Sequence, residues 1–356
     1  MWPYWVMFAV PAFFALSAEM RKNKIRSTNL NNEWMSVIIV MTLLIGYRFE
    51  VGGDWGNYLG RFDEIYGTSL DDVWMMKDPG YNLISWLSIQ MEWGIYGVNL
   101  FGGAVFSTGL VLFCLHLPRP WLALAVAIPY LLIVVAMGYS RQAIALGFAM
   151  LGLVQLERNK TLWFVFYGFL GATFHKSAVL LLPIAALVNS RNRYWTIAWV
   201  TVIAIFVYQV LLKDSTENLY GAYVEPQMQS SGALIRLLMN AIPSLILLRW
   251  LNHFQFKRSE AKLWLMFAYI SSGMLGLLMF TSATTALDRM ALYLLPLQLV
   301  VFSHFPEVFG NPRKSNDALV VAVLLYYTAV EFVWLNYADN AYAWIPYRFY
   351  PLEAWF

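Results

Sequence analysis

Long apolar runs recur from one end of this chain to the other, with short polar links between them. A transmembrane helix needs about 20 mostly apolar residues, and shorter or broken helices are accepted where protein surrounds them. The pattern therefore predicts an all-α polytopic membrane protein with about twelve transmembrane helices. The predicted spans lie at residues 2–18, 34–47, 97–116, 121–138, 142–156, 161–175, 177–189, 194–212, 233–251, 262–281, 287–305 and 317–336.

The composition agrees with this class. Of the 356 residues, 60% are hydrophobic and 13% are charged, whereas a soluble domain carries roughly 25% charged residues. The single cysteine, Cys114, leaves no partner for an intramolecular disulfide and excludes a cysteine-based metal site. No internal repeat and no soluble segment interrupts the pattern, so residues 1–356 are predicted to form one transmembrane domain.

Basic residues gather in alternate links between the predicted spans. Links rich in lysine and arginine stay on the cytoplasmic side of a membrane, so these links are predicted to be cytoplasmic and both termini to be outside. The basic residues concerned are Arg21, Lys22, Lys24, Arg26, Arg119, Arg158, Lys160, Arg191, Arg193, Lys257, Arg258, Arg313 and Lys314.

The opposite links are longer and different in character. They comprise an outer loop at 48–96, a second outer loop at 213–232 and a tail at 336–356. The first loop is acidic and aromatic, and its residues 74–93 have apolar side chains at helical spacing. We expect this part of the loop to form interfacial helices that lie along the membrane surface.

Charged side chains stand at the outer ends of several predicted spans, where they are costly to place. They are Arg48, Arg141, the pair His175–Lys176 and the pair Asp288–Arg289. Charges buried at random would not collect on one side. A single polar cavity that opens to the outside is therefore the simplest interpretation.

The excess charge at these positions is positive, which suits a phosphate or diphosphate headgroup. Arg236, near the start of another span, is a further candidate for the same group. Each arginine alone could instead reach a lipid phosphate or form a structural pair, such as Arg289 with Asp288. Asp54 and His175 are the groups able to accept a proton near neutral pH.

Several signatures are absent from the sequence. It contains no H-E-x-x-H zinc motif, no G-x-S-x-G nucleophile motif and no nucleotide-binding fingerprint. No compact cluster of carboxylates appears in the spans, so neither a metal nor a cofactor is expected. Nothing in the chain suggests a nucleic-acid partner.

Five short motifs follow one another in a recognisable order. They are R-x-x-x-G-x-D-x-x-x-Y from Arg48 to Tyr58, D-P-G-Y at 78–81, Arg141–Gln142, H-K-S-A at 175–178, and R-x-x-x-Y from Arg289 to Tyr293. In this order and spacing, over about residues 40–300, the chain resembles the EpsG-like, Wzy-type polysaccharide polymerases.

The resemblance implies a glycosyltransferase of the bacterial cytoplasmic membrane with a GT-C-like helical fold. Such an enzyme moves a glycan from undecaprenyl diphosphate to the sugar of another lipid-linked repeat unit, on the outer face of the membrane. The expected partners are the undecaprenyl-diphosphate-linked oligosaccharide and membrane lipid. A chain-length regulator is a candidate protein partner.

On this reading, fixed cations stabilise the departing diphosphate, and a base takes the proton of the acceptor hydroxyl. His175 is the first candidate for the base and Asp54 the second. The expected diphosphate-binding residues are Arg48, Arg141, Arg289, Lys176 and Arg236, and the expected sugar-binding residues are Tyr58, Tyr81 and Tyr293.

Two other functions would also need a cationic cavity. A flippase or exporter of lipid-linked oligosaccharides must expose its site to both sides, so charges through the full depth of the bilayer and a two-fold repeat would be expected. An O-antigen ligase shares the donor and the leaving group, and the physics of the sequence does not separate it from a polymerase. The motif resemblance alone favours the polymerase.

Overall fold

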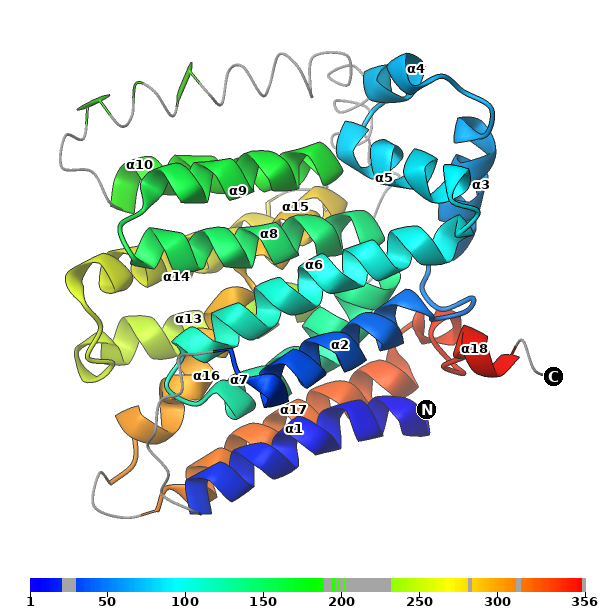
Figure 1. Cartoon of the computed structure of the whole chain (residues 1–356). Coiled ribbons are helices and arrows are strands. Elements are labelled where there is room, and N and C mark those ends of the chain that lie inside the picture. Colours follow the sequence, from blue (N-terminus) through cyan, green and yellow to red (C-terminus); the bar gives the residue numbers. More distant parts are fainter. Residues whose placement is uncertain are drawn as a thin grey trace.

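The computed structural model describes residues 1–20, 30–188, 232–280, 284–311 and 315–353, together with residues 194, 195, 198, 201 and 202. Helices make up almost all of this part of the chain, and they run roughly parallel or antiparallel to one another in one bundle (Figure 1). The predicted span at 194–212 and the predicted outer loop at 213–232 lie mostly outside the described residues.

Most of the bundle helices coincide with the predicted spans. They are α1 (Trp2–Met20), α2 (Asn32–Gly46), α6 (Gly94–His116), α7 (Pro120–Ala127) with the π-helix η1 (Ile128–Ala136), α8 (Ser140–Glu157), α9 (Thr161–Phe174), the 3-10 helix η2 (Lys176–Leu181) with α10 (Leu182–Val188), α13 (Ala233–Trp250) with η4 (Leu251–His253), α14 (Arg258–Leu278), α15 (Thr284–Ala291) with η5 (Leu292–Leu294) and α16 (Pro296–Val308), and α17 (Asp317–Tyr337).

Six helices among the described residues are long and apolar enough to cross a membrane, which agrees with a multi-pass membrane protein. Three shorter apolar helices lie at Asn32–Gly46, Pro120–Ala136 and Thr161–Phe174. The predicted count of about twelve spans is therefore not confirmed. Several helices are interrupted by short π-helical or 3-10 segments. Such interruptions are tolerated within a membrane where protein or a polar cavity surrounds the backbone.

The two ends of the bundle differ in the groups that they carry. At one end, Arg119 forms ion pairs with Glu19 at 3.0 Å and Glu307 at 3.2 Å, and so joins the ends of α1 and α16. The other end carries the helices that connect α2 to α6, and we call it the loop end (Figure 1). The first residues of α1 and the short helix α18 (Tyr350–Glu353) also lie there.

The segment between α2 and α6 contains three helices, and the last of them lies within residues 74–93, where the sequence predicts a helix. Its position along a membrane surface stays a prediction. The three helices are α3 (Trp55–Ile65), α4 (Leu70–Met75) and α5 (Pro79–Gln90). Local chemistry fixes their starts. The Ser69 hydroxyl accepts the Asp72 backbone N–H at 3.2 Å at the start of α4. Proline occupies the first position of α5, where its missing N–H costs no hydrogen bond.

The most deeply buried part of the bundle is the helix that begins as α7 and continues as η1. Every residue from Leu122 to Gly138 is buried, as expected for a segment that is hydrophobic on all sides. The π-helical turns of η1 end at Ala136, and α8 begins at Ser140 after a short break at Tyr139. Two other helices break at the same end of the bundle, at His175 and at η5. These three breaks bring non-helical backbone and polar side chains together.

Candidate functional site

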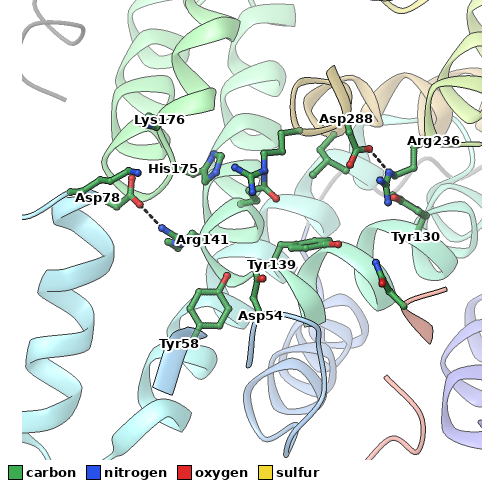
Figure 2. Close-up of a pocket in the computed structure, with 15 residues that line it drawn as sticks. Asp54, Tyr58, Asp78, Tyr130, Tyr139, Arg141, His175, Lys176, Arg236 and Asp288 are labelled. Atoms are coloured by element: carbon green, nitrogen blue, oxygen red, sulfur yellow. Dashed lines mark hydrogen bonds and ion pairs between the residues drawn. The ribbon is translucent and has the colours of Figure 1, made fainter. Parts of the chain in front are cut away.

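A cavity of about 310 Å³ lies among these breaks at the loop end (Figure 2). Charged, amide and tyrosine side chains dominate its wall. The lining residues are Asp54, Tyr58, Lys77, Asp78, Tyr130, Tyr139, Arg141, Gln142, His175, Lys176, Arg236, Asp288, Arg289, Leu292 and Asn340.

Most of these residues stand where a helix begins, ends or changes type. Asp54 precedes α3 and Asp78 precedes α5, while Arg141 lies in the first turn of α8. His175 follows the last residue of α9, and Lys176 begins η2. These positions place the charged side chains at the loop end. There they face a polar cavity, whereas elsewhere in the bundle they would be surrounded by apolar side chains.

Seven of the ten residues predicted for the site line this cavity. They come from five separate segments of the chain, so only the tertiary fold unites them. They are Asp54, Tyr58, Arg141, His175, Lys176, Arg236 and Arg289.

Arg48 is not among the lining residues. Its side chain is 1% exposed and donates to the carbonyls of Ile45 at 2.5 Å and Val51 at 3.2 Å. It also donates to Asn99 Oδ1 at 3.0 Å and Ser140 Oγ at 2.7 Å. Burial lowers the pKa of Arg48 to about 10. The guanidinium therefore stays charged at neutral pH and ties the start of the first loop to the start of α8.

Tyr81 and Tyr293 also lie behind the cavity wall. The Tyr81 ring is fully buried and packs against Tyr58, with 5.6 Å between the ring centroids. The hydroxyl of Tyr293, which is 3% exposed, lies 3.4 Å from Nδ1 of His175. Tyr81 therefore supports a lining tyrosine, and Tyr293 orients the histidine.

Two ion pairs occupy the cavity. Arg141 donates to Asp78 at 2.7 Å, and the Asp78 side chain is only 5% exposed. Asp78 has a left-handed backbone with φ 61°, which few residues other than glycine adopt readily. The second pair joins Arg236 to Asp288. Asp288 therefore pairs across to α13, not with its sequence neighbour Arg289.

The lining carries an excess of positive charge. Five cationic side chains face three carboxylates, which leaves two positive charges in excess. Among the described residues, no carboxylate lies within ion-pair distance of Lys176 or Arg289. The described lining is therefore suited to an anion. The cationic residues are Lys77, Arg141, Lys176, Arg236 and Arg289, and the carboxylates are Asp54, Asp78 and Asp288.

The two candidate bases respond differently to these surroundings. Burial, followed by the charges of Arg141 and Arg289, lowers the pKa of His175 to about 3. The imidazole is therefore neutral at neutral pH, so one of its two ring nitrogens carries no proton. Burial raises the pKa of Asp54, although Arg141 opposes this shift. A bound anion would offset the cations and raise the pKa of His175 again.

The C-terminal segment forms part of the cavity wall, a role that no local feature of the sequence indicates. Asn340 lines the cavity, and Trp344 is 1% exposed behind it. The Trp344 indole N–H donates to the Ile133 carbonyl at 2.8 Å, and its ring packs on Gly138. The Tyr4 hydroxyl donates to the Trp344 carbonyl at 2.5 Å. The first helix and the tail thus both hold the wall of the cavity.

Backbone hydrogen bonds also join the C-terminal segment to the first loop. Gly52 donates its N–H to the Ala343 carbonyl at 2.8 Å. Gly52 has φ 109° and packs directly on the Met137 carbonyl, so a larger residue would be strained there. Phe49 donates to the Arg348 carbonyl at 2.9 Å. Gly52, the glycine of the first motif, is therefore a point of close packing between three chain segments.

Sequence reasoning did not assign a site role to several lining residues. Asp78 lies in the D-P-G-Y motif and Gln142 follows Arg141, so motif position could have identified both. The tyrosines lie in apolar runs and the asparagine lies in the tail, where no local signal marks them. The unassigned residues are Lys77, Asp78, Tyr130, Tyr139, Gln142, Asp288, Leu292 and Asn340.

Among the residues that the structure describes, no group of three or more His, Cys, Asp or Glu side chains could hold a metal ion.

Comparison with known proteins gives one match. The sequence model of the EpsG family matches residues 33–349, which is most of the chain. It begins at α2 and extends through the tail segment that contains Trp344. No curated protein and no solved structure matches the chain.

Proposed function

Since the chain belongs to the EpsG family, we propose that it is a membrane glycosyltransferase that polymerises polysaccharide repeat units. The donor is a glycan on undecaprenyl diphosphate, and the acceptor is the terminal sugar of another lipid-linked repeat unit. The observation that carries this proposal is the cavity at the loop end, with its five cations and three carboxylates around a neutral histidine.

In the proposed reaction the acceptor oxygen attacks the anomeric carbon of the donor sugar. The bond from that carbon to the diphosphate breaks, and the electron pair leaves with the lipid diphosphate. Negative charge therefore grows on the leaving group, and fixed cations in a site with little water stabilise it strongly. Arg141, Lys176 and Arg289 are assigned this role because they line the cavity. Arg48 is assigned a positioning role.

His175 is proposed to accept the proton of the acceptor hydroxyl. Its Nδ1 lies 3.4 Å from the Tyr293 hydroxyl, so a proton held on that side leaves Nε2 free as the base. The bound diphosphate strengthens this base, because it offsets the cations that lower the pKa of His175. Asp54 also lines the cavity and is the second candidate for the base.

The proposal places the loop end on the outer face of the bacterial cytoplasmic membrane, with about twelve spans in a GT-C-like arrangement. It is supported by the alternation of basic links in the sequence. Arg119, one of those basic residues, lies at the end of the bundle opposite the loop end.

The test is an assay with purified protein, its own undecaprenyl-diphosphate-linked repeat unit and EDTA, read as a ladder of products. The wild-type protein is expected to give a ladder. His175→Gln is expected to reduce the rate by ~10² or more, because an amide cannot take the proton. Arg158→Ala, an exposed change at the opposite end of the bundle, is the control and should leave the ladder intact.

Other results would assign a different function. Transport of the lipid-linked unit across a proteoliposome bilayer without a ladder would identify a flippase. Transfer of the glycan to lipid A core would identify a ligase. A ladder that EDTA abolishes and magnesium restores would contradict the expected absence of a metal.

The pH profile supplies a separate prediction. Burial, followed by the charge of Lys77, lowers the pKa of Lys176 to about 8. The ammonium is charged below this pH and neutral above it, so kcat/KM is expected to fall as the pH rises through about 8. Lys176→Arg should remove this alkaline fall, because a guanidinium stays charged. Lys160→Arg, exposed at the opposite end, is the control. An unchanged alkaline limb in Lys176→Arg would refute the assignment.

A further inference from the structure

The cavity contains two groups with the same composition: an arginine, an aspartate and a tyrosine. In the first, Arg141 pairs with Asp78, and its guanidinium lies 5.9 Å from the centre of the Tyr58 ring. The second contains Arg236, Asp288 and Tyr130. Figure 2 shows the two groups on opposite sides of the cavity, with His175 and Tyr139 between them.

The surroundings of the two groups differ in charge. Lys77 and Lys176 lie beside Asp78, and the charges of both Lys77 and Asp78 act on Lys176. The first group therefore belongs to a half of the cavity with excess positive charge. The Arg236–Asp288 pair lies near two tyrosines and next to Arg289, whose charge also acts on His175 and Lys176. Tyr130 and Tyr139 both lie within electrostatic range of Arg236 and Asp288.

These two environments suit different chemical groups. Phosphate oxygens only accept hydrogen bonds and favour cations whose charge is not already offset. Sugar hydroxyls donate and accept, so a paired arginine and carboxylate offer them both partners. Aromatic rings beside such a pair provide an apolar surface for the sugar ring. Asp288 offsets the charge of Arg236, and Asp78 likewise offsets the charge of Arg141. Lys77 and Lys176 add further positive charge beside the Arg141–Asp78 pair, so that half of the cavity is the better site for a diphosphate.

We propose that Arg236, Asp288, Tyr130 and Tyr139 form the subsite for the terminal sugar of the acceptor glycan. The donor diphosphate then lies in the opposite half, at Arg141, Lys77 and Lys176, with Arg289, whose charge acts on both Lys176 and His175. His175 stands between the two substrates. This inference rests on the proposed polymerase function and changes the assignment of Arg236 from diphosphate binding to sugar binding.

The variant Asp288→Asn separates the two assignments, because they predict opposite effects on different ligands. If Arg236 bound the diphosphate, loss of the negative charge beside it would tighten the binding of undecaprenyl diphosphate. In a sugar subsite, loss of the carboxylate removes strong acceptors and weakens sugar binding. Hydrogen bonds to a charged group contribute about 1.5–3 kcal/mol, so a loss of ~10-fold or more in sugar affinity is expected.

The experiment measures equilibrium binding of two probes to the purified full-length protein. One probe is undecaprenyl diphosphate without sugar, and the other is the free repeat-unit oligosaccharide without lipid or phosphate. Asp288→Asn should weaken the oligosaccharide ~10-fold and leave undecaprenyl diphosphate unchanged. The matched variant Asp78→Asn, in the other group, should instead tighten the binding of undecaprenyl diphosphate.

Tighter binding of undecaprenyl diphosphate to Asp288→Asn, or unchanged binding of both probes, would overturn the proposal. If Asp288→Asn does not fold, the double variant Arg236→Gln, Asp288→Asn leaves no unpaired charge and should show the same selective loss of oligosaccharide binding. A wild-type protein that gives no product ladder and binds neither probe would instead refute the polymerase function itself.

Discussion

Replacement of Arg141 by alanine is expected to abolish polymer synthesis, with a fall in rate of at least ~10²-fold. Arg141 lines the cavity, pairs with Asp78 at 2.7 Å and lies over the Tyr58 ring. Its loss removes the cation best placed to meet the leaving diphosphate. The product ladder of the purified protein is the measurement.

The same change leaves Asp78 buried without its partner, so a loss of folding must be distinguished from a loss of chemistry. An unpaired buried charge is costly, and Asp78→Asn removes that charge. The double variant Arg141→Ala, Asp78→Asn should therefore recover thermal stability in detergent but remain inactive. Arg141→Lys keeps the charge and loses the planar fork, so intermediate activity is expected. Full activity in the double variant would exclude Arg141 from the reaction.

The second large effect is expected from Trp344→Ala. This side chain is 1% exposed, its indole N–H donates to the Ile133 carbonyl at 2.8 Å, and its ring packs on Gly138. Removal of a buried aromatic side chain typically costs about 3–5 kcal/mol. It would also leave the Ile133 carbonyl, in the π-helix, without this donor. We expect a large fall in the melting temperature and loss of activity, because the wall that carries Tyr139 would move.

Trp2→Ala is the matched control for this experiment. Trp2 lies at the start of the first helix and is 75% exposed, so its replacement should change the melting temperature little. Trp344→Phe keeps the ring volume in part and loses the hydrogen bond, so its stability should lie between those of wild type and Trp344→Ala. Equal stability of Trp344→Ala and wild type would show that the tail does not hold the cavity.

Much of the candidate site could be predicted from the sequence, because charge in an apolar chain is a strong local signal. Arg141, His175 and Arg289 interrupt or end apolar runs, and all three line the cavity. Arg48 also follows an apolar run, but it is buried and does not line the cavity. Its guanidinium is buried and donates to four hydrogen-bond partners behind the cavity wall. Sequence alone could not separate these cases, because both place a charge at the end of a helix.

The ion-pair partners of the cavity residues also could not be predicted from the local sequence. Asp288 and Arg289 are adjacent in the sequence, which suggests an ion pair, but adjacent residues on a helix point in different directions. The ion pair instead joins Asp288 to Arg236 on α13. Tyr130 gave no signal because it lies within a wholly apolar run, and the fold alone brings it to Arg236.

By itself, the sequence determined that the chain is helical and suited to a membrane, and that its unusual charges belong to one end of the bundle. These properties follow from the length of the apolar runs and from the cost of burying charge. Only the tertiary structure decided which charges face a common cavity and that Trp344, far along the chain, packs beneath it. Such contacts depend on side-chain packing between distant segments, which the local pattern of a sequence does not encode.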